Sequence, residues 1–253
     1  MKRILVTNDD GVRSPGLHAL AQAVSRLGDV TVVAPHIEAS AIGHALTLRR
    51  PLRVERIDQQ VFEVDGTPTD CVNVAIAHIL GGQPDLVLSG INKGYNLGDD
   101  VTYSGTVAGA MEGALLGIPG IAVSLERTAG TYDFGPAAAA AAQVAERLLA
   151  GSSFPSRTFL NINVPGGRPK GFRATVQARR NHVTVVNERI DPRGQAYYWI
   201  EEGQNDWQPH DRSDYQAVRD GFISLTPLQP DLTDYHALAL LDELAAWREV
   251  EAE

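Results

Sequence analysis

The sequence predicts an α/β protein built on a Rossmann-like, doubly wound and mostly parallel sheet. Up to residue 165, short apolar runs alternate with segments whose apolar residues recur at helical spacing. Strand, helix and strand in that order imply right-handed crossovers and parallel pairing. After residue 167 apolar and polar residues alternate instead, which is typical of antiparallel strands. We therefore expect a Rossmann-like domain over residues 1–167 and a C-terminal β-arm and helix segment over residues 168–253.

Helix-start signals and apolar runs define the elements of the first domain. Pro15 opens a helix with Ser14 in the capping position, and Thr67 with Asp70 forms a capping box before the next helix. The expected strands are 4–6, 30–35, 84–92, 118–125 and 158–164, with a hairpin or extended excursion at 46–54 and 61–64 and further helices at 103–117 and 137–150.

The C-terminal segment predicts an arm, a returning strand and a terminal helix. The arm comprises residues 172–178, 183–187 and 196–200, with a turn at 191–194 and aromatic residues Tyr197, Tyr198, Trp199 and Trp207. Exposed aromatic side chains on a projecting arm favour a subunit contact, and packing back on the parent domain is the alternative. Residues 221–227 form a strand that can rejoin the main sheet, and the helix runs over 234–251.

Composition narrows the class of protein. Its hydrophobic content of 43% and charged content of 21% are ordinary for a globular protein. No apolar run approaches the ~20 residues of a membrane span, and the run after Met1 is too short for a signal peptide. The single cysteine, Cys71, fits a reducing cytoplasm. A net charge of −9 argues against binding a nucleic-acid polymer, but not against a small anionic substrate.

Oxygen-bearing side chains follow three neighbouring strands at one edge of the predicted sheet. Asp9 and Asp10 follow the first strand, Ser40 follows the second and Asn92 follows the third. Carboxylate, hydroxyl and amide oxygens are hard ligands, so they favour Mg²⁺ or Mn²⁺ over zinc or copper. The alternative for Asp9 and Asp10 alone is a solvated Asp-Gly turn.

One helix start is suited to phosphate. Ser104-Gly105-Thr106 offers free backbone amides and two hydroxyls at the beginning of the 103–117 helix, although a plain Ser/Thr cap is an equal alternative. The chain contains no G-x-x-x-x-G-K-[ST], no G-x-G-x-x-G after the first strand and no G-x-S-x-G. These absences disfavour a P-loop ATPase, a dinucleotide oxidoreductase and an α/β-hydrolase.

The combination of these segments resembles the SurE family, the stationary-phase survival proteins that are metal-dependent 5′-nucleotidases. The matching segments are Val6-Thr7-Asn8-Asp9-Asp10-Gly11, Val33-Ala34-Pro35 with Ser40, Gly66-Thr67-Pro68-Thr69-Asp70-Cys71-Val72, Ser89-Gly90-Ile91-Asn92, Asn96-Leu97-Gly98-Asp99-Asp100, Tyr103-Ser104-Gly105-Thr106-Val107 and Leu160-Asn161-Ile162-Asn163-Val164-Pro165. The resemblance extends to residues 191–194 and the terminal helix, so it covers essentially the whole chain.

The resemblance implies a phosphomonoesterase that converts nucleoside 5′-monophosphates to nucleoside and phosphate. It implies one divalent cation per subunit, Mg²⁺ or Mn²⁺, bound by Asp9, Asp10, Ser40 and Asn92. It also implies a homodimer or homotetramer assembled through the arm and an exchanged C-terminal helix.

These residues suggest a mechanism of in-line hydrolysis by a metal-activated water. Asp9 and Asp10 are the expected catalytic residues, with Asp10 favoured as the proton acceptor. Asn96, Ser104, Gly105 and Thr106 are expected to bind the phosphate through amide and hydroxyl donors. A phospho-aspartate at Asp9 is a mechanistic alternative. A phosphotransferase or glycosyltransferase, or a nucleotide sensor without turnover, are the alternative functions.

Overall fold

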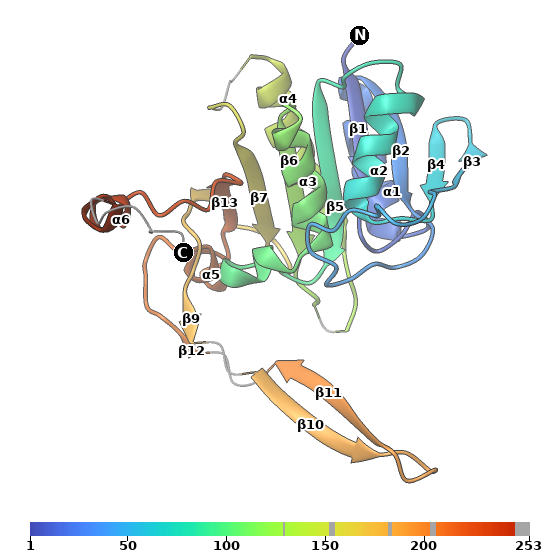
Figure 1. Ribbon diagram of the computed structural model, residues 1–253. Helices are drawn as coiled ribbons and strands as arrows, with labels where there is room; N and C mark the ends of the chain where they lie inside the picture. The colour runs from blue at the N-terminus through green and yellow to red at the C-terminus, as the bar shows by residue number, and fades with distance from the viewer. Residues whose placement is uncertain (129, 152–154, 182–183, 203–205, 246–253) are drawn as a thin grey trace.

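The computed structural model describes residues 1–128, 130–151, 155–181, 184–202 and 206–245 of the 253-residue chain. It confirms the α/β class with a nine-stranded central sheet in the order β3-β4-β2-β1-β5-β6-β7-β13-β8 (Figure 1). The sheet strands are β1 (Arg3–Thr7), β2 (Asp29–Pro35), β3 (Val54–Asp58), β4 (Val61–Val64), β5 (Leu86–Lys93), β6 (Gly120–Leu125), β7 (Phe159–Val164), β8 (Phe172–Ala174) and β13 (Ile223–Leu228).

The centre of the sheet is parallel and its margins are mixed. Strands β4, β2, β1, β5, β6 and β7 pair in parallel, as the strand and helix alternation predicts. At one margin β3 pairs antiparallel with β4. The hairpin expected from residues 46–54 and 61–64 forms between β3 and β4, but only Val54 of the first stretch belongs to β3 and the residues before it run outside the sheet. Leu46 and Leu48 are exposed instead of packed.

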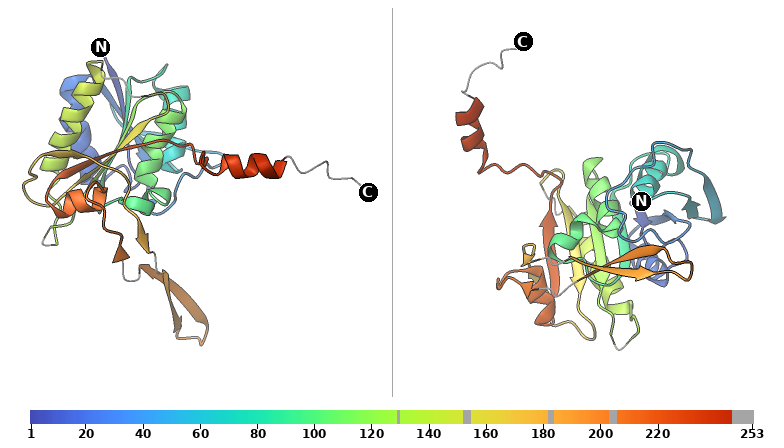
Figure 2. Two further views of the ribbon diagram at one scale, coloured as in Figure 1. Left: turned by 90° about the vertical axis from the view of Figure 1, so that its left-hand side faces the viewer. Right: turned by 60° about the horizontal axis from the view of Figure 1, so that its bottom comes forward.

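Helices cover both faces of the sheet. They are α1 (Pro15–Val24), α2 (Pro68–Val74), α3 (Gly105–Leu115) and α4 (Gly135–Leu149). In the second view of the fold, α1 and α4 lie on one side and α2 and α3 on the other (Figure 2). Alternate residues of β1 serve the two layers, since Ile4 packs with α1 and α4 while Leu5 packs with α2. Burial on both faces explains why the strands read as continuous apolar runs.

Glycines allow α3 to approach the sheet closely. A Cβ at Gly109 would lie 2.8 Å from Ser89 Oγ, and one at Gly113 would lie 2.9 Å from Val87 Cβ, both on β5. The same helix begins against the end of β1, where a Cβ at Gly105 would lie 2.7 Å from Asp9 Cβ. The small residues of α3 therefore place its N-terminus directly over the turn that follows β1 and carries Asp9 and Asp10, which we call the acidic turn.

Part of the C-terminal segment joins the central sheet. Strand β13 pairs antiparallel with β7, in agreement with the expectation that residues 221–227 can rejoin the sheet. The short helix α5 (Asp214–Arg219) precedes it. Only Phe172–Ala174 of the expected 172–178 strand forms, and this β8 pairs with β13 instead of joining the arm. A strand of three residues is stabilised mainly by its hydrogen bonds to the neighbouring strand. The alternation of apolar and polar residues within 172–178 does not predict which strand that neighbour is.

The arm itself is the antiparallel pair β10 (Thr184–Ile190) and β11 (Ala196–Glu202), which projects from the body (Figure 1). Its base is a second small pair, β9 (Arg180–Asn181) with β12 (Asp206–Trp207). The terminal helix α6 is described over Leu238–Ala245, and it extends away from the sheet (Figure 2). Val183 of the arm and residues 246–251 of the expected helix lie outside the described residues. None of the helices in the described ranges is both long and apolar enough to cross a membrane.

Candidate functional site

The acidic turn lies at the carboxyl end of β1, where the strand order of the sheet reverses direction. The chain passes from β1 to β2 on one side and returns to place β5 on the other. Crevices at such a switch point are the usual ligand sites of open α/β sheets. Asn8 is buried and its Nδ2 donates to the Gly11 carbonyl at 3.0 Å. Gly11 has a φ of 94°, so this bond and the glycine together shape the turn that presents Asp9 and Asp10.

Asp9 is buried between the strand end and the start of α3. Its side chain is only 4% exposed, and the Thr106 hydroxyl donates a hydrogen bond to Oδ1. Burial and the neighbouring charge of Asp10 raise the pKa of Asp9 to about 6, while the Thr106 hydrogen bond opposes the rise. Because burial and the Asp10 charge disfavour the ionised form of Asp9, a cation bound beside this carboxylate would stabilise the ionised form.

Asp10 is half-buried and has partners on two sides. Lys93 Nζ lies 3.6 Å from Oδ1, and the Ser14 hydroxyl donates to Oδ2 at 3.5 Å. Ser14 occupies the capping position of α1 but makes no capping hydrogen bond, so the expected cap is replaced by this contact. Desolvation raises the pKa of Asp10, Lys93 lowers it, and the charge of Glu38 raises it.

The Ser40 loop, residues 36–44, is fastened against the acidic turn and the start of α3. The Ala39 amide donates to the Asp9 carbonyl at 2.7 Å, and the Gly43 amide donates to the Tyr103 carbonyl at 2.9 Å. Ser40 lies between these two points, and its hydroxyl donates to Glu38 Oε1 at 2.7 Å. The proton of Ser40 is therefore directed at Glu38, which leaves oxygen lone pairs as acceptors for a cation.

Asn92 lies near the end of β5, beside the acidic turn. Its Nδ2 donates to the Gly94 carbonyl at 3.0 Å, so the amide is oriented and its Oδ1 is an available acceptor. The register of β5 against β6 shifts between Ser89 and Asn92. This irregularity lies where the strand reaches the site.

The four oxygen-bearing residues fit a hard divalent cation. Among the residues that the structure describes, no three His, Cys, Asp or Glu side chains gather in a way suited to a metal ion. The expected set has only two carboxylates, Asp9 and Asp10, and its other donors are the Ser40 hydroxyl and the Asn92 amide. Two carboxyl groups whose pKa values are raised by burial and like charge are the electrostatic situation that a divalent cation relieves.

The expected phosphate-binding residues divide into two groups. Ser104 is the N-cap of α3, its Oγ accepting from the Val107 amide at 3.1 Å, and Gly105 opens the helix. The Thr106 hydroxyl is committed to Asp9. The structure thus brings the helix start together with the acidic turn.

Asn96 lies farther along the same sheet edge, in a buried amide network. Its Nδ2 donates to Ser124 Oγ at 2.8 Å, and its backbone amide donates to Asn163 Oδ1 at 2.8 Å. The Nδ2 groups of Asn161 and Asn163 both donate to its carbonyl. Ser124 belongs to β6 and Asn163 to β7, so the network holds the loop after β5 across the next two strands.

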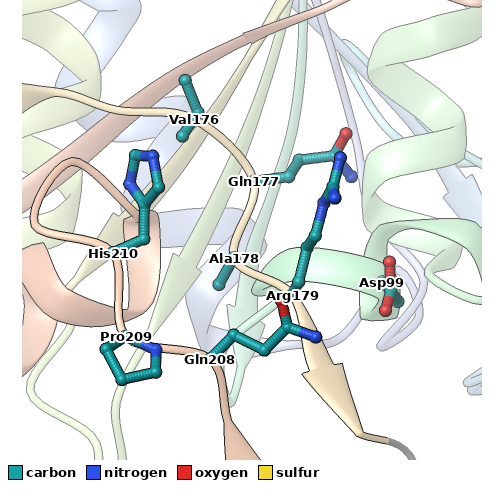
Figure 3. Close-up of a pocket in the computed structure, with 8 residues that line it drawn as sticks. All are labelled: Asp99, Val176, Gln177, Ala178, Arg179, Gln208, Pro209 and His210. Atoms are coloured by element: carbon teal, nitrogen blue, oxygen red, sulfur yellow. The ribbon is translucent and has the colours of Figure 1, made fainter.

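Two cavities flank the loop that carries Asn96. The first, of about 620 Å³, is lined by Asp99, Gln177, Arg179 and His210 among others (Figure 3). The second, of about 730 Å³, is lined in part by Tyr95, Trp207 and Tyr215. Both lie between this loop and the C-terminal segment, and neither lining includes Asp9 or Asp10.

The family model for survival protein SurE matches residues 4–184. The chain belongs to the SurE family. It is 52% identical over 239 residues to the 5′-nucleotidase SurE of Syntrophotalea carbinolica, covering 94% of this chain and 95% of the relative. It is 52% identical over 245 residues to the 5′-nucleotidase SurE of Geotalea daltonii, covering 94% and 97%. The crystal structure of the SurE protein from Aquifex aeolicus superposes with a TM-score of 0.85 at 43% identity, covering 96% of this chain and 99% of that one.

Three residues of this SurE chain contact or act on the expected ligands without having been predicted as part of the candidate site. Glu38 accepts from Ser40 and acts on Asp10, and Lys93 and Ser14 contact Asp10. Lys93 directly follows Asn92, and Glu38 lies two residues before Ser40. Their closeness in sequence to the expected ligands was therefore the signal that could have identified Lys93 and Glu38 as residues of the candidate site. The approach of Lys93 and Glu38 to Asp10 joins segments that are far apart in the chain, whereas the Ser14 contact with Asp10 and the Glu38 contact with Ser40 are local.

Proposed function

We propose that this SurE chain is a 5′-nucleotidase, a hydrolase of phosphoric monoesters that depends on a divalent cation. It releases nucleoside and phosphate from nucleoside 5′-monophosphates. The names of relatives about 50% identical over nearly the whole chain support this activity. The observation that carries it is the packing of Asp9 against the N-terminus of α3, because a cation held by Asp9 and its neighbour Asp10 would share one phosphate with the helix amides.

Asp9, Asp10, Ser40 and Asn92 are the proposed ligands of one cation per subunit, Mg²⁺ or Mn²⁺. When bound, such an ion lowers the pKa of a water in its shell and neutralises charge on the phosphoryl oxygens. Thr106 orients the Asp9 carboxylate, and Glu38 accepts the Ser40 hydroxyl proton so that the Ser40 oxygen keeps its lone pairs for a cation.

Asp10 is the proposed acceptor of the proton from the attacking water. Asp9 is held by Thr106 and lies under Gly105, whereas Asp10 is half-buried with only long contacts to Lys93 and Ser14. Burial raises the pKa of Asp10, and the Lys93 ammonium opposes that rise by favouring the ionised carboxylate. An ionised carboxylate with weak hydrogen bonds is the better base.

The start of α3 is the proposed phosphate site. The Ser104 hydroxyl, which accepts from Val107, retains its own proton for donation, and the Gly105 region supplies backbone amides. The Thr106 hydroxyl contributes by orienting Asp9 rather than by contacting the phosphate. Asn96, held by the amide network, is the proposed contact on the far side of the phosphate.

We infer that the chain functions as a homodimer or homotetramer joined by the arm and by α6. Tyr198 and Trp199 on β11 and Leu240 on α6 are more than half exposed in the single chain. Large apolar side chains on projecting elements favour burial in a second subunit. The cytoplasm is the proposed location, and the buried free thiol of Cys71 is compatible with it.

Phosphate release tests the proposed function. The purified chain is incubated with a panel of nucleoside 5′-monophosphates, with EDTA and then with Mg²⁺ or Mn²⁺ restored. We expect release that EDTA abolishes and the metal restores. Transfer only to an added acceptor would identify a phosphotransferase, and nucleotide binding without release under any metal would identify a sensor. A trapped phospho-aspartate would replace the direct attack of water.

A further inference from the structure

An exposed apolar rim borders the proposed phosphate site. Tyr103 directly precedes the N-cap Ser104 and is 61% exposed, and Ile42 on the Ser40 loop is 41% exposed. A single exposed apolar side chain is common on a protein surface, so the significance of these two rests on their position together beside the proposed phosphate site. The rim is therefore a surface beside the reaction centre that the steps of hydrolysis do not use.

The two residues of the rim come from different segments that one hydrogen bond joins. The Gly43 amide donates to the Tyr103 carbonyl at 2.9 Å, which brings the residue after Ile42 against Tyr103. The same loop is bonded to Asp9 through Ala39. Tyr103 and Ile42 are thus attached, through short chain connections, to both the acidic turn and the helix start.

We propose that Tyr103 and Ile42 form a platform on which the nucleobase of the substrate stacks. This inference rests on the proposed 5′-nucleotidase function and adds the residues that recognise the nucleoside. An aromatic ring offers stacking to every base, and residues 39–43 carry no charged side chain that would select one. The platform therefore favours nucleotides over small phosphate esters while discriminating weakly among bases.

The cavity beside Trp207 is a less suitable place for the base. Trp207 and Tyr215 already stack on each other, with ring centroids 4.5 Å apart and an interplanar angle of 11°. The Arg180 guanidinium carbon also lies 5.3 Å from the Trp207 ring centroid. These rings are occupied by intramolecular contacts, whereas Tyr103 presents its side chain to solvent beside the phosphate site.

Steady-state kinetics on two substrates tests the platform. Adenosine 5′-monophosphate carries a base and ribose 5-phosphate does not. For Tyr103→Ala we expect KM for the nucleotide to rise about tenfold with kcat nearly unchanged, because base stacking contributes to ground-state and transition-state binding alike. KM for ribose 5-phosphate should not change. Tyr103→Phe should retain the wild-type preference, since the ring remains.

Ile42→Ala should raise KM for the nucleotide by a smaller factor, and Ile57→Ala is its control. Ile57 is also 41% exposed and lies on β3, the marginal strand of the sheet, outside the proposed site. Thermal unfolding monitors folding, and Tyr103→Leu replaces the alanine variant if that variant is unstable.

Equal losses on both substrates, or no loss on either, would overturn the platform. A selective loss in Trp207→Ala with none in Tyr103→Ala would overturn it as well and place the base in the neighbouring cavity. A wild-type chain that releases phosphate from ribose 5-phosphate but from no nucleotide would overturn the platform and the 5′-nucleotidase function together. Nucleotide hydrolysis that Tyr103→Ala leaves unaffected would overturn the platform alone.

Discussion

The edge of the sheet at the acidic turn and the projecting β10–β11 arm differ in which side chains they bury and which they expose. At the sheet edge, Asp9 and Asn96 are buried polar residues whose side chains are oriented by hydrogen bonds within the chain, Asp9 by the Thr106 hydroxyl and Asn96 by Ser124 Oγ. On the arm, large apolar side chains are exposed, including Trp199 at 56% and Ile200 at 76%. The arm extends from the same side of the sheet on which the parallel strands end (Figure 1).

The difference indicates that contacts within one subunit satisfy the side chains of the sheet edge, whereas those of the arm need a second subunit. The sheet edge fixes several of its donors and acceptors by hydrogen bonds within the chain, which is the condition for electrostatic preorganisation. A two-stranded hairpin is marginally stable alone, and its exposed apolar faces leave burial to a second subunit. Four measurements probe this comparison.

The strongest test of the sheet edge is Asp9→Asn. Removing the charge of a proposed ligand should lower kcat/KM for a nucleoside monophosphate by at least about 100-fold. Calorimetric titration with Mn²⁺ should show weaker binding. Asp58→Asn, an exposed carboxylate on β3, serves as the matched control and should leave both quantities unchanged. Unaltered turnover in Asp9→Asn would contradict the ligand assignment.

Thr106→Val tests whether the direction of Asp9 matters apart from its charge. The substitution preserves the shape of the side chain but removes the hydroxyl that donates to Oδ1. A loss of about 10-fold in metal affinity is expected, as for other groups that orient a ligand. The control is Thr102→Val, whose hydroxyl donates to the Asp99 carbonyl on the exposed side of the loop. Equal behaviour of the two variants would mean that Thr106 has no orienting role.

The metal-free protein should lose stability as the pH rises through the titration of Asp9. The ordinary pKa of the carboxyl is 3.8 and the folded value is about 6, so the folded state binds more protons between these values. The free energy of unfolding therefore falls between pH 4 and pH 6, by an amount on the order of 3 kcal/mol for this group. Urea unfolding in EDTA measures it.

Asp9→Asn removes this pH dependence and should make the metal-free protein more stable at pH 7. Asparagine retains an oxygen that accepts from Thr106 without carrying the buried charge. If wild type and Asp9→Asn have the same free energy of unfolding at pH 4 and at pH 7, then burial of the Asp9 charge does not cause the loss of stability with rising pH.

The smallest expected effect on the folded chain belongs to the arm. Ile200→Lys places a charge on an exposed face, so the unfolding free energy of the subunit should change by no more than about 0.5 kcal/mol. Light scattering should nevertheless show a shift toward the 27.2 kDa subunit mass. Ile57→Lys on β3 is the control for an added surface charge. A variant arm that leaves the assembly intact would exclude the arm from the interface.

Local patterns in the sequence determined most of the central fold. The alternation of apolar runs and helical spacing predicts β1, α1, β2, β5, α3, β6, α4 and β7 in order. The Thr67 and Asp70 capping box forms as predicted. These features are predictable because periodicity and capping depend on residues within one or two turns of each other. The position of Asp9, Asp10 and Asn92 near strand ends follows from the same local signals.

Only the tertiary structure decided how distant segments meet. Strand β8 pairs with β13, about 50 residues away, because the open margin of the sheet accepts it. Thr106 and Asp9 are joined because the glycines of α3 let that helix approach the sheet. Lys93 of β5 lies against Asp10, and Glu38 of the Ser40 loop acts on the same carboxylate. The residue types were visible along the chain, but the partner of each depends on packing between elements, which local sequence does not encode.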